Sequence, residues 1–388
     1  LGKPAVPTMA GLLTRRDLSL PTRRRIVTAL ASIEGSAARD SLIALAEEPA
    51  LGPAAMNSLL RMRVAGRIDP IDPATLQGTM EEEMAKGLRF SLAASGLRSM
   101  AGDNPEAIFV ARELESLRAR SLHRVLRVLS LSYDTRRLSP VATALLSKDI
   151  ARVSNALELL EGSISQDTAA LVMPFMEAAA ENFPEWRTIE LVPDAITILQ
   201  NPGETLTNEK DWWPRSLGLH VLGRDDEIST PGRHKNKADD AQEDEAMIPL
   251  IEKVMILKGS ELFRNFPGPD LAGIASLAQV VYLEPDEVLF NQGEEGDAFY
   301  MVVQGGVRIT RGSTELAILG TREGFGEMAI LDQETRSATA TAAEATTLLR
   351  IGQDSFDQLI EQNPTVARGI YRVLTERLRN TLAQVAAG

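Results

Sequence analysis

The spacing of apolar residues changes once along this chain, and that change constrains the fold more than any other feature. From about residue 21 to residue 223, apolar side chains recur at the three- and four-residue intervals of amphipathic helices. From Gln279 onward they fall into short runs rich in β-branched residues, separated by Gly-containing turns. The sequence therefore predicts a helical region followed by a separate β region.

The helical region consists of short apolar stripes, such as the one from Met56 to Val64. Three breaks, Asp103–Pro105, Ser139–Pro140 and Gln166–Asp167, are predicted to end one helix or cap the next. Paired helices repeating about every 35 to 45 residues are typical of an α-solenoid. Residues 1–223 therefore resemble HEAT repeats, and an irregular helical bundle is the alternative.

Charged and turn-forming residues replace the apolar pattern between the two regions. This stretch contains Pro231-Gly232 and the acidic run Glu243–Glu245, a composition typical of a flexible linker. We therefore predict a HEAT-like helical repeat domain over 1–223, an acidic linker over 224–246 and a second domain over 247–388.

Short β runs follow one another from Val280 to Ile351. Strands of this kind with Gly-rich turns predict a small antiparallel β-barrel or jelly roll. A helix from Met247 to Leu257 is expected before it, and two helices after it, Asp354–Glu361 and Pro364 to about Val385. The predicted fold is thus multidomain, an N-terminal HEAT-like α-solenoid followed by an antiparallel β-barrel or jelly roll with flanking helices.

Composition excludes several classes of function. The formal net charge of −13 repels phosphate backbones, so we expect no nucleic-acid partner. Because there is no cysteine and the three histidines show no paired ligand spacing, we expect no metal site. No phosphate loop, nucleophile elbow or kinase motif is present, and we expect no enzyme activity.

The sequence also bears on location. It contains neither an apolar run long enough to span a membrane nor a secretory leader, so we expect no membrane span in this segment and a cytoplasmic location. Because it begins with Leu1 rather than Met, we expect it to be part of a longer chain, which leaves room for an upstream membrane domain.

One segment carries the chemistry, Gly324 to Ala340, which reads Gly-Phe-Gly-Glu-Met-Ala-Ile-Leu-Asp-Gln-Glu-Thr-Arg-Ser-Ala-Thr-Ala. It looks like the phosphate-binding cassette of the cyclic-nucleotide-binding family, which includes bacterial catabolite activators, protein kinase A regulatory subunits and gated ion channels. Gln292–Tyr300, followed by Gly305, matches the family's other motif. The resemblance covers residues 255–384, and Thr335 departs from it because many members have proline there.

Elementary chemistry supports a phosphate site in this segment. Gly326 lets the backbone approach a ligand, and a short helix beginning at Glu327 would point its first amides, including those of Met328 and Ala329, at an anion. Arg336 offers forked donors to the oxygens of a cyclic phosphate. The alternative is that Arg336 and Glu327 form only a surface ion pair.

Further contacts concern the sugar, the phosphate and the base. The resemblance gives Glu327 the ribose 2′-hydroxyl as a partner, whereas Ser337 and Ala338 can add hydrogen bonds to the phosphate. A C-terminal helix would cover the purine with Thr381, for which a solvent-facing position is the alternative. Ser337 fits either base, so cyclic AMP is the predicted ligand and cyclic GMP the other candidate.

These observations predict a cyclic-nucleotide-sensing regulatory protein that couples ligand binding to an α-solenoid interaction domain. An unidentified protein would bind the solenoid, and a homodimer could form through the C-terminal helix. Two alternatives remain, a protein-interaction scaffold with a non-binding barrel and the cytosolic regulatory tail of a larger transporter-like membrane protein.

Overall fold

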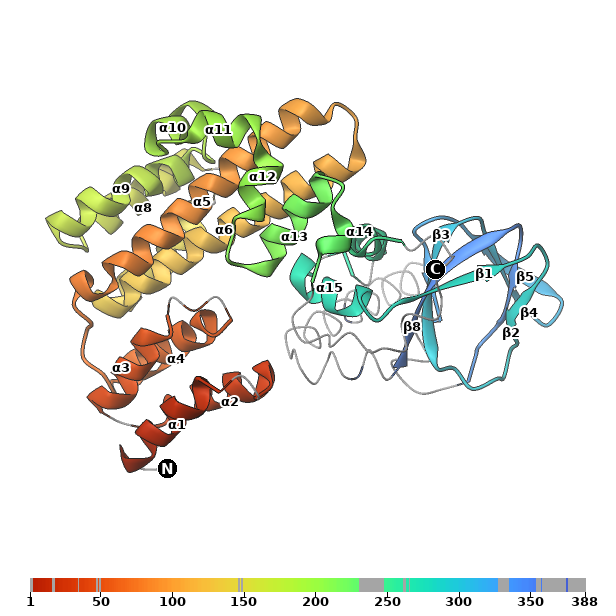
Figure 1. Cartoon of the computed structure of the whole chain (residues 1–388), viewed down its shortest axis with the longest axis horizontal. Helices are drawn as coiled ribbons and strands as arrows, with labels where there is room; N and C mark the ends of the chain where they lie inside the picture. Colours follow the sequence, from red (N-terminus) through yellow and green to blue (C-terminus); the bar gives the residue numbers. More distant parts are fainter. Residues whose placement is uncertain are drawn as a thin grey trace, which may run out of the picture. The chain divides into compact units, whose positions relative to one another are not determined.

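The chain divides into two compact units, Leu1–Gly223 and Arg224–Gly388 (Figure 1). The computed structural model describes residues 3–353, 357 and 375, apart from 16–17, 34, 47, 49, 146, 148, 230–247, 261–262, 265 and 327–334. The two closing helices predicted over Asp354–Glu361 and from Pro364 therefore lie outside the described residues, as does most of the predicted linker.

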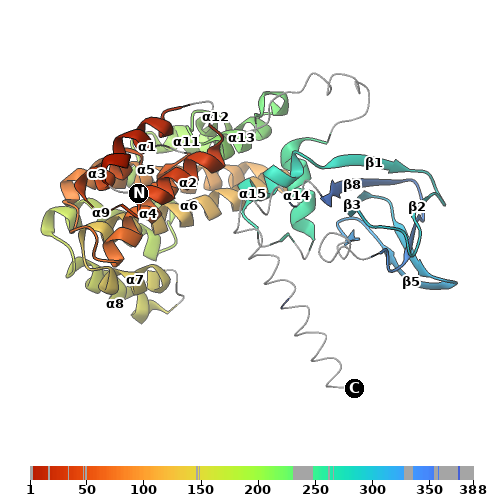
Figure 2. The ribbon, with the colours of Figure 1, turned by 90° about the horizontal axis from the view of Figure 1, so that it is seen from below.

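The first unit is built from helices and begins with a short 3-10 turn at Lys3–Ala5; a second such turn, Asp225–Glu227, follows at the start of the second unit. In chain order these helices are α1 (Val6–Leu13), α2 (Leu20–Leu30), α3 (Ser36–Ala44), α4 (Gly52–Val64), α5 (Pro73–Ala101), α6 (Pro105–Ser132), α7 (Thr135–Leu145), α8 (Ile150–Glu161), α9 (Gln166–Ala180), α10 (Glu185–Leu191), α11 (Ala195–Gln200), α12 (Pro202–Thr207) and α13 (Trp212–Val221). The long α5 and α6 lie side by side as a hairpin through this unit (Figures 1 and 2). They provide the surface on which α4, α7 and α9–α13 pack.

Side-chain caps explain where several helices begin. The Asn104 carboxamide accepts a hydrogen bond from the backbone N–H of Glu106 at 2.9 Å, with Pro105 as the first residue of α6. Ser165 caps α9 in the same way through the N–H of Thr168. The predicted breaks at 103–105 and 166–167 are therefore confirmed.

The break predicted at Ser139–Pro140 is wrong, because Pro140 lies inside α7. Proline lacks the N–H that a helix interior uses, so it leaves one carbonyl of the preceding turn without its helical donor. Both residues are exposed, which lets water satisfy that carbonyl. The helix continues across a residue that usually ends one.

The central helix α5 is buried on every side over part of its length. Residues Phe90–Ala94, more than one helical turn, are all buried, and α5 contacts α6 and α9–α12. A helix surrounded in this way shows no single apolar stripe in its sequence. Helix lengths in this unit run from 6 residues in α11 to 29 in α5. The region is helix-rich as predicted, but the HEAT-like repeat is not confirmed.

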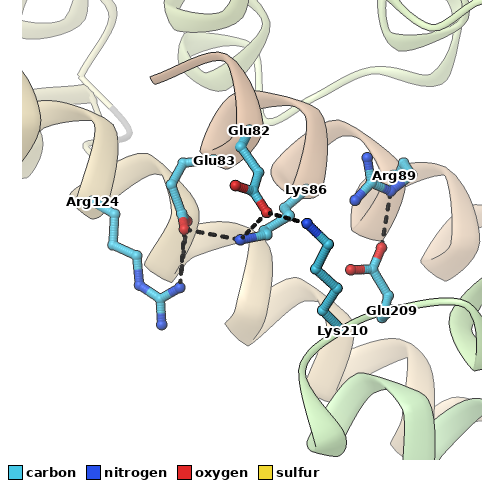
Figure 3. Close-up of polar contacts among 7 residues, drawn as sticks. All are labelled: Glu82, Glu83, Lys86, Arg89, Arg124, Glu209 and Lys210. Atoms are coloured by element: carbon cyan, nitrogen blue, oxygen red, sulfur yellow. Dashed lines mark hydrogen bonds and ion pairs between the residues drawn. The ribbon is translucent and has the colours of Figure 1, made fainter. Parts of the chain in front are cut away.

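A network of charges ties the α12–α13 corner to the α5–α6 hairpin (Figure 3). Its innermost contact joins Arg89 Nε to Glu209 Oε1 at 2.9 Å, and the Glu209 side chain is 7% exposed. Around it, opposite charges lie within 3.8 Å of one another in the pairs Lys86–Glu82, Lys86–Glu83, Arg124–Glu83 and Lys210–Glu82. Every charge in this network has an opposite partner, so its role is to hold helices together.

The second unit begins with α14 (Leu250–Gly259) and α15 (Gly268–Ala275) and continues as strands. These are β1 (Gln279–Leu283), β2 (Val288–Phe290), β3 (Ala298–Gln304), β4 (Val307–Arg311), β5 (Thr314–Leu319), β6 (Gly324–Phe325), β7 (Thr339–Ala342) and β8 (Thr346–Gly352). They form two antiparallel four-stranded sheets, β1-β8-β3-β6 and β2-β7-β4-β5. Within the described residues the sheets do not pair with each other, so the architecture is a sandwich and not the closed barrel that was one predicted form.

The core of this unit lies between the two sheets. Ala298, Tyr300 and Val302 alternate along β3 and face it, together with Phe325 and Leu348. The intervening Phe299 is buried as well, because its ring lies 5.6 Å from that of Phe263 on the outer side of the sheet. Strand β3 is thus covered on both faces, which explains its unbroken apolar sequence.

Candidate functional site

Arg336 lies inside the sandwich although it carries a full positive charge. The residue is 5% exposed. Its guanidinium carbon lies 4.1 Å from the ring centroid of Phe290 and 5.6 Å from that of Tyr300. Aromatic faces attract cations, so the two rings hold the guanidinium at the edge of the core. Such a position is unusual for arginine, because a buried positive charge is unfavourable unless a hydrogen-bond acceptor or a negative charge compensates it.

The polar partners of Arg336 compensate its charge only in part. Nη1 donates to the carbonyl of Ala298 at 3.0 Å and more weakly to that of Gly326 at 3.4 Å. The nearest carboxylate oxygen, on Asp297, is 3.7 Å from Nη2, which is too long for a hydrogen bond. Nε is buried without a hydrogen-bond partner among the described residues. Among the described residues, the five N–H donors of Arg336 therefore share one good acceptor, the carbonyl of Ala298.

Burial lowers the pKa of Arg336, and nearby Tyr300 and Asp297 oppose the shift. An arginine nevertheless stays protonated at any physiological pH, because its pKa starts so high. The site thus keeps a partly desolvated positive charge with unused donors. Chemically, this arrangement favours an oxyanion that can accept two hydrogen bonds from the guanidinium.

Gly326 shapes the other side of the guanidinium. It follows β6 directly, has a φ of +79°, and a Cβ at this position would lie 2.7 Å from Arg336 Nη1 and 3.1 Å from the carbonyl oxygen of Ala298. Only glycine fits both the backbone conformation and the space. We expected this glycine to admit a ligand, and the structure shows that it also admits the Arg336 side chain.

The two motifs found in the sequence are hydrogen-bonded to each other. The N–H of Gly293 donates to the carbonyl of Arg336, and the N–H of Arg336 donates to the carbonyl of Glu294, both at 2.8 Å. An antiparallel bridge joins Glu295 to Thr335. This pairing fixes the backbone at Arg336, so its side chain enters the sandwich in a defined direction.

Sequence reasoning missed two residues that complete this charge cluster, Asp297 and Arg350. Asp297 Oδ2 lies 2.6 Å from Nη2 of Arg350 on β8, while its Oδ1 faces Arg336. Burial opposes the charged form of Arg350, but the hydrogen bonds that its guanidinium donates to Tyr300 and Asp297, with the charges of those two groups, outweigh it and raise the pKa of Arg350. Asp297 belongs to the motif Gln292–Tyr300, whereas nothing in the sequence distinguishes Arg350 from an ordinary strand residue.

The other predicted site residues divide into two groups. Ser337 is exposed and its carbonyl accepts a hydrogen bond from Nε of Arg311 at 3.3 Å, while Ala338 is buried beside the start of β7. Glu327, Met328, Ala329 and Thr381 lie outside the described residues. The structure therefore brings Gly326 against Arg336, with Ser337 and Ala338 following Arg336 in the chain.

Neither a metal cluster nor a membrane helix is found in the described part of the chain. No group of three His, Asp or Glu side chains there is arranged to hold a cation. None of the described helices has the length and apolarity needed to cross a bilayer.

Comparison with known proteins identifies the fold around Arg336. Residues 280–363 match the cyclic nucleotide-binding domain family. The chain is 38% identical over 128 residues to the cyclic AMP receptor protein of Thermus thermophilus, covering 32% of this chain and 59% of that protein. It is 28% identical over 131 residues to a CRP-like cAMP-activated global transcriptional regulator of Mycobacterium tuberculosis, covering 32% and 58%.

A third relative belongs to another class. The cGMP-dependent protein kinase of Eimeria tenella is 34% identical over 87 residues, which cover 22% of this chain and 9% of the kinase. The chain thus spans about three fifths or less of the length of these relatives. The match leaves the HEAT-like resemblance of residues 1–223 a prediction. For residues 280–363 the predicted resemblance is confirmed, and the second unit contains a cyclic nucleotide-binding domain.

Proposed function

We propose that the sandwich binds a cyclic nucleotide and that the protein is a non-enzymatic regulator in which binding changes what the helical unit does. The observation that carries the proposal is the buried guanidinium of Arg336, which has only one good hydrogen-bond acceptor among the described residues. A buried charge with unused donors is unfavourable unless a ligand completes it. The cyclic phosphate supplies the missing negative charge and acceptor oxygens.

The remaining contacts follow from the resemblance. In this proposal the backbone amides of Met328 and Ala329 and the residues Ser337 and Ala338 bind the phosphate, and the Glu327 carboxylate accepts from the ribose 2′-hydroxyl. Thr381 contacts the purine. Cyclic AMP is the proposed ligand because two relatives with broad coverage are named for it, while the relative named for cyclic GMP matches over fewer residues.

Titration calorimetry with cyclic AMP, cyclic GMP and linear 5′-AMP tests the ligand. Cyclic AMP should bind most tightly. Arg336→Ala should weaken its binding by roughly 100-fold or more, since a charge-assisted pair in a partly buried site contributes about 3 kcal/mol. Arg308→Ala is the matched control, because Arg308 lies on β4 with carboxylates of Asp286 and Glu315 nearby at the surface. Equal affinity for wild type and Arg336→Ala would overturn the site.

The ribose contact has a separate test. Glu327→Gln should weaken binding of cyclic AMP but leave 2′-deoxy cyclic AMP unaffected, because the deoxy ligand lacks the hydroxyl that Glu327 would bind. An equal loss for both ligands would mean that Glu327 acts on something other than the ribose. Titrating Thr381→Ala with cyclic AMP and with cyclic GMP tests the proposed contact between Thr381 and the purine.

Coupling to the helical unit requires that two states of the protein bind the ligand differently. Hydrogen exchange of residues 3–223, with and without saturating cyclic AMP, measures that coupling directly. Protection that changes only in the sandwich would favour the alternative of a scaffold whose two units act separately. Sequencing the full reading frame decides whether the segment is instead the regulatory tail of a transporter-like membrane protein.

A further inference from the structure

A groove of about 1630 Å³ lies in the helical unit, and all of its lining residues belong to that unit. Its walls come from the end of α4, the turn between α6 and α7, and the helices α7 and α8. Helices α7 and α8 lie together at one side of the unit (Figure 2). Its lining includes three arginines and three apolar residues, namely Arg63, Arg136, Arg152, Val64, Pro140 and Leu159.

The size of the groove suits a segment of protein better than a small molecule. Pockets for drug-sized ligands usually measure about 300–1,000 Å³. An α-helix with its side chains is about 11 Å wide and rises about 5.4 Å per turn, so one turn occupies on the order of 500 Å³. The groove therefore accommodates about three turns of helix.

Apolar side chains are available along it. Val64 at the end of α4 is 72% exposed and Leu159 on α8 is 40% exposed, and both line the groove. Pro140, inside α7, adds an apolar ring to the same lining. An apolar stripe at helical spacing on a partner would cover these side chains and remove them from water.

The charge in the groove is positive, in a chain whose net charge is −13. Arg63, Arg136 and Arg152 line it, against one acidic residue, Asp134. Asp134 is engaged already, as it accepts from the backbone N–H of Arg136 at 2.9 Å and lies 4.0 Å from Arg137. Within the part of the chain that the structure describes, none of the three lining arginines pairs with a carboxylate.

We propose that this groove binds an acidic amphipathic helix of a protein partner. Helix-in-groove recognition needs apolar anchors and complementary charge, and the lining residues of this groove supply both. The proposal extends the proposed function by giving the helical unit a class of partner, but it rests on residues 52–161 alone and its test needs no nucleotide.

The charge distribution of the helical unit argues against a second copy as the occupant. Residues 1–152 carry 22 Lys and Arg against 16 Asp and Glu, whereas residues 153–223 carry 3 against 11. A second copy would therefore present its acidic half to the basic groove of the first. Such a contact joins two different surfaces, so it would give a ring or a filament instead of a two-fold dimer.

The test is a selection from a displayed library of amphipathic helical peptides whose polar faces vary from acidic through neutral to basic. The full-length chain is the bait, and the fully folded double variant Arg136→Glu/Arg152→Glu is the counter-selection bait. We expect enrichment of peptides with apolar residues at i, i+3 or i+4 and i+7 and with Asp or Glu beside them. No enrichment over the double variant, or enrichment of neutral or basic peptides, would overturn the proposal.

Fluorescence anisotropy with an enriched peptide then measures affinity. The double variant should bind at least about tenfold more weakly, since each lost charge pair at a rim is replaced by repulsion. Arg24→Glu, an equally exposed arginine on α2 outside the groove, should bind within twofold of wild type. Leu159→Ser should weaken binding without changing its dependence on salt, and circular dichroism confirms that each variant is folded.

Two further results would each reject the proposal. A labelled DNA or RNA duplex that binds through Arg136 and Arg152 would make the groove a nucleic-acid site. A sedimentation coefficient of the wild-type chain that rises with concentration, and does not rise in the double variant, would make the groove a contact between copies. Peptide selection, duplex titration and sedimentation therefore separate the three occupants, and Arg336→Ala should leave the selected peptides bound, which separates this proposal from nucleotide binding.

Discussion

Each unit of this protein has an arginine in a cluster of charges, half-buried Arg89 in the helical unit and buried Arg336 in the sandwich, and the two differ in how their charge is compensated. In the helical unit, Arg89 lies 2.9 Å from a carboxylate oxygen of Glu209, inside a network whose charges all have partners. In the sandwich, Arg336 is more deeply buried, yet its nearest carboxylate oxygen is 3.7 Å away and one of its nitrogens has no partner among the described residues.

This difference is the one expected between charges that hold a fold together and a charge that binds a ligand, as we propose for Arg336. A completed pair holds helices in register and becomes unfavourable when one member is removed. A buried charge without a full set of partners reduces the stability of the unliganded fold. Its presence is best explained by a ligand that it binds. Four substitutions test this distinction.

Gly326→Ala should have the largest effect on stability. Alanine at a φ of +79° is strained by about 1–2 kcal/mol, and its Cβ would lie 2.7 Å from Arg336 Nη1, so we expect a total loss of about 2–3 kcal/mol. Gly312→Ala is the matched control, because Gly312 also has a positive φ, +59°, but open space around it. Urea unfolding followed by tyrosine and tryptophan fluorescence measures both, and equal losses would mean that the contact with Arg336 is unimportant.

Glu209→Ala should follow, with a loss of about 1–2 kcal/mol. The carboxylate is 7% exposed, and its removal leaves Arg89 without its closest partner, although Arg89 can still reach water. Glu177→Ala removes a carboxylate at the same 2.9 Å distance from Arg187, but Glu177 is 48% exposed, so the loss should stay under about 0.5 kcal/mol. Calorimetry of the thermal unfolding of the full chain compares the two, and the expected order would be contradicted by a larger loss in Glu177→Ala.

Arg336→Met should change stability in the opposite direction. Methionine has a similar length and no charge, so the unliganded sandwich should keep its stability or gain up to about 1 kcal/mol. Arg89→Met in the helical unit should lose stability instead. If both variants lost the same amount, the proposed distinction between the two arginines would be wrong.

Glu294 should show the smallest effect, and only through pH. Hydrogen bonds from the side chain and the backbone N–H of Asn291 lower its pKa in the folded protein. A group whose pKa falls on folding stabilises the protein above its unfolded pKa, and this contribution disappears as the pH falls through the folded pKa. The stability difference between wild type and Glu294→Gln should therefore shrink between pH 7 and pH 3. A difference that grew on acidification would contradict the assignment.

The sequence predicts the β region better than the helical one, for physical reasons. The short runs rich in β-branched and apolar residues and the glycines between them are local features, and the Gly326–Arg336 spacing is local as well. Arg350 joins the charge cluster through strand pairing between β3 and β8, which no local pattern records. The choice between a closed barrel and a two-sheet jelly roll, both of which the sequence left open, depends on strand pairing in the same way.

In the helical region, the sequence did not predict three features of the structure. Residues Phe90–Ala94 of α5 are buried on all sides, so no amphipathic stripe marks the helix that organises the unit. Pro140 was predicted to end a helix and lies within α7, because an exposed helix can do without one hydrogen bond. The groove that we propose as a docking site depends on α4, α6, α7 and α8 together, which the sequence alone does not assemble.

The α5–α6 hairpin has a consequence for the order of folding. The two helices, 29 and 28 residues long, are joined by only three residues, 102–104, so their contacts bring together parts of the chain that are close in sequence. Contacts of this kind form early because little loop entropy opposes them. We therefore expect the hairpin to appear first during refolding, with α1–α4 and α7–α13 docking onto it later. Pulse-labelling hydrogen exchange would show this as early protection of residues 76–97 and 110–131.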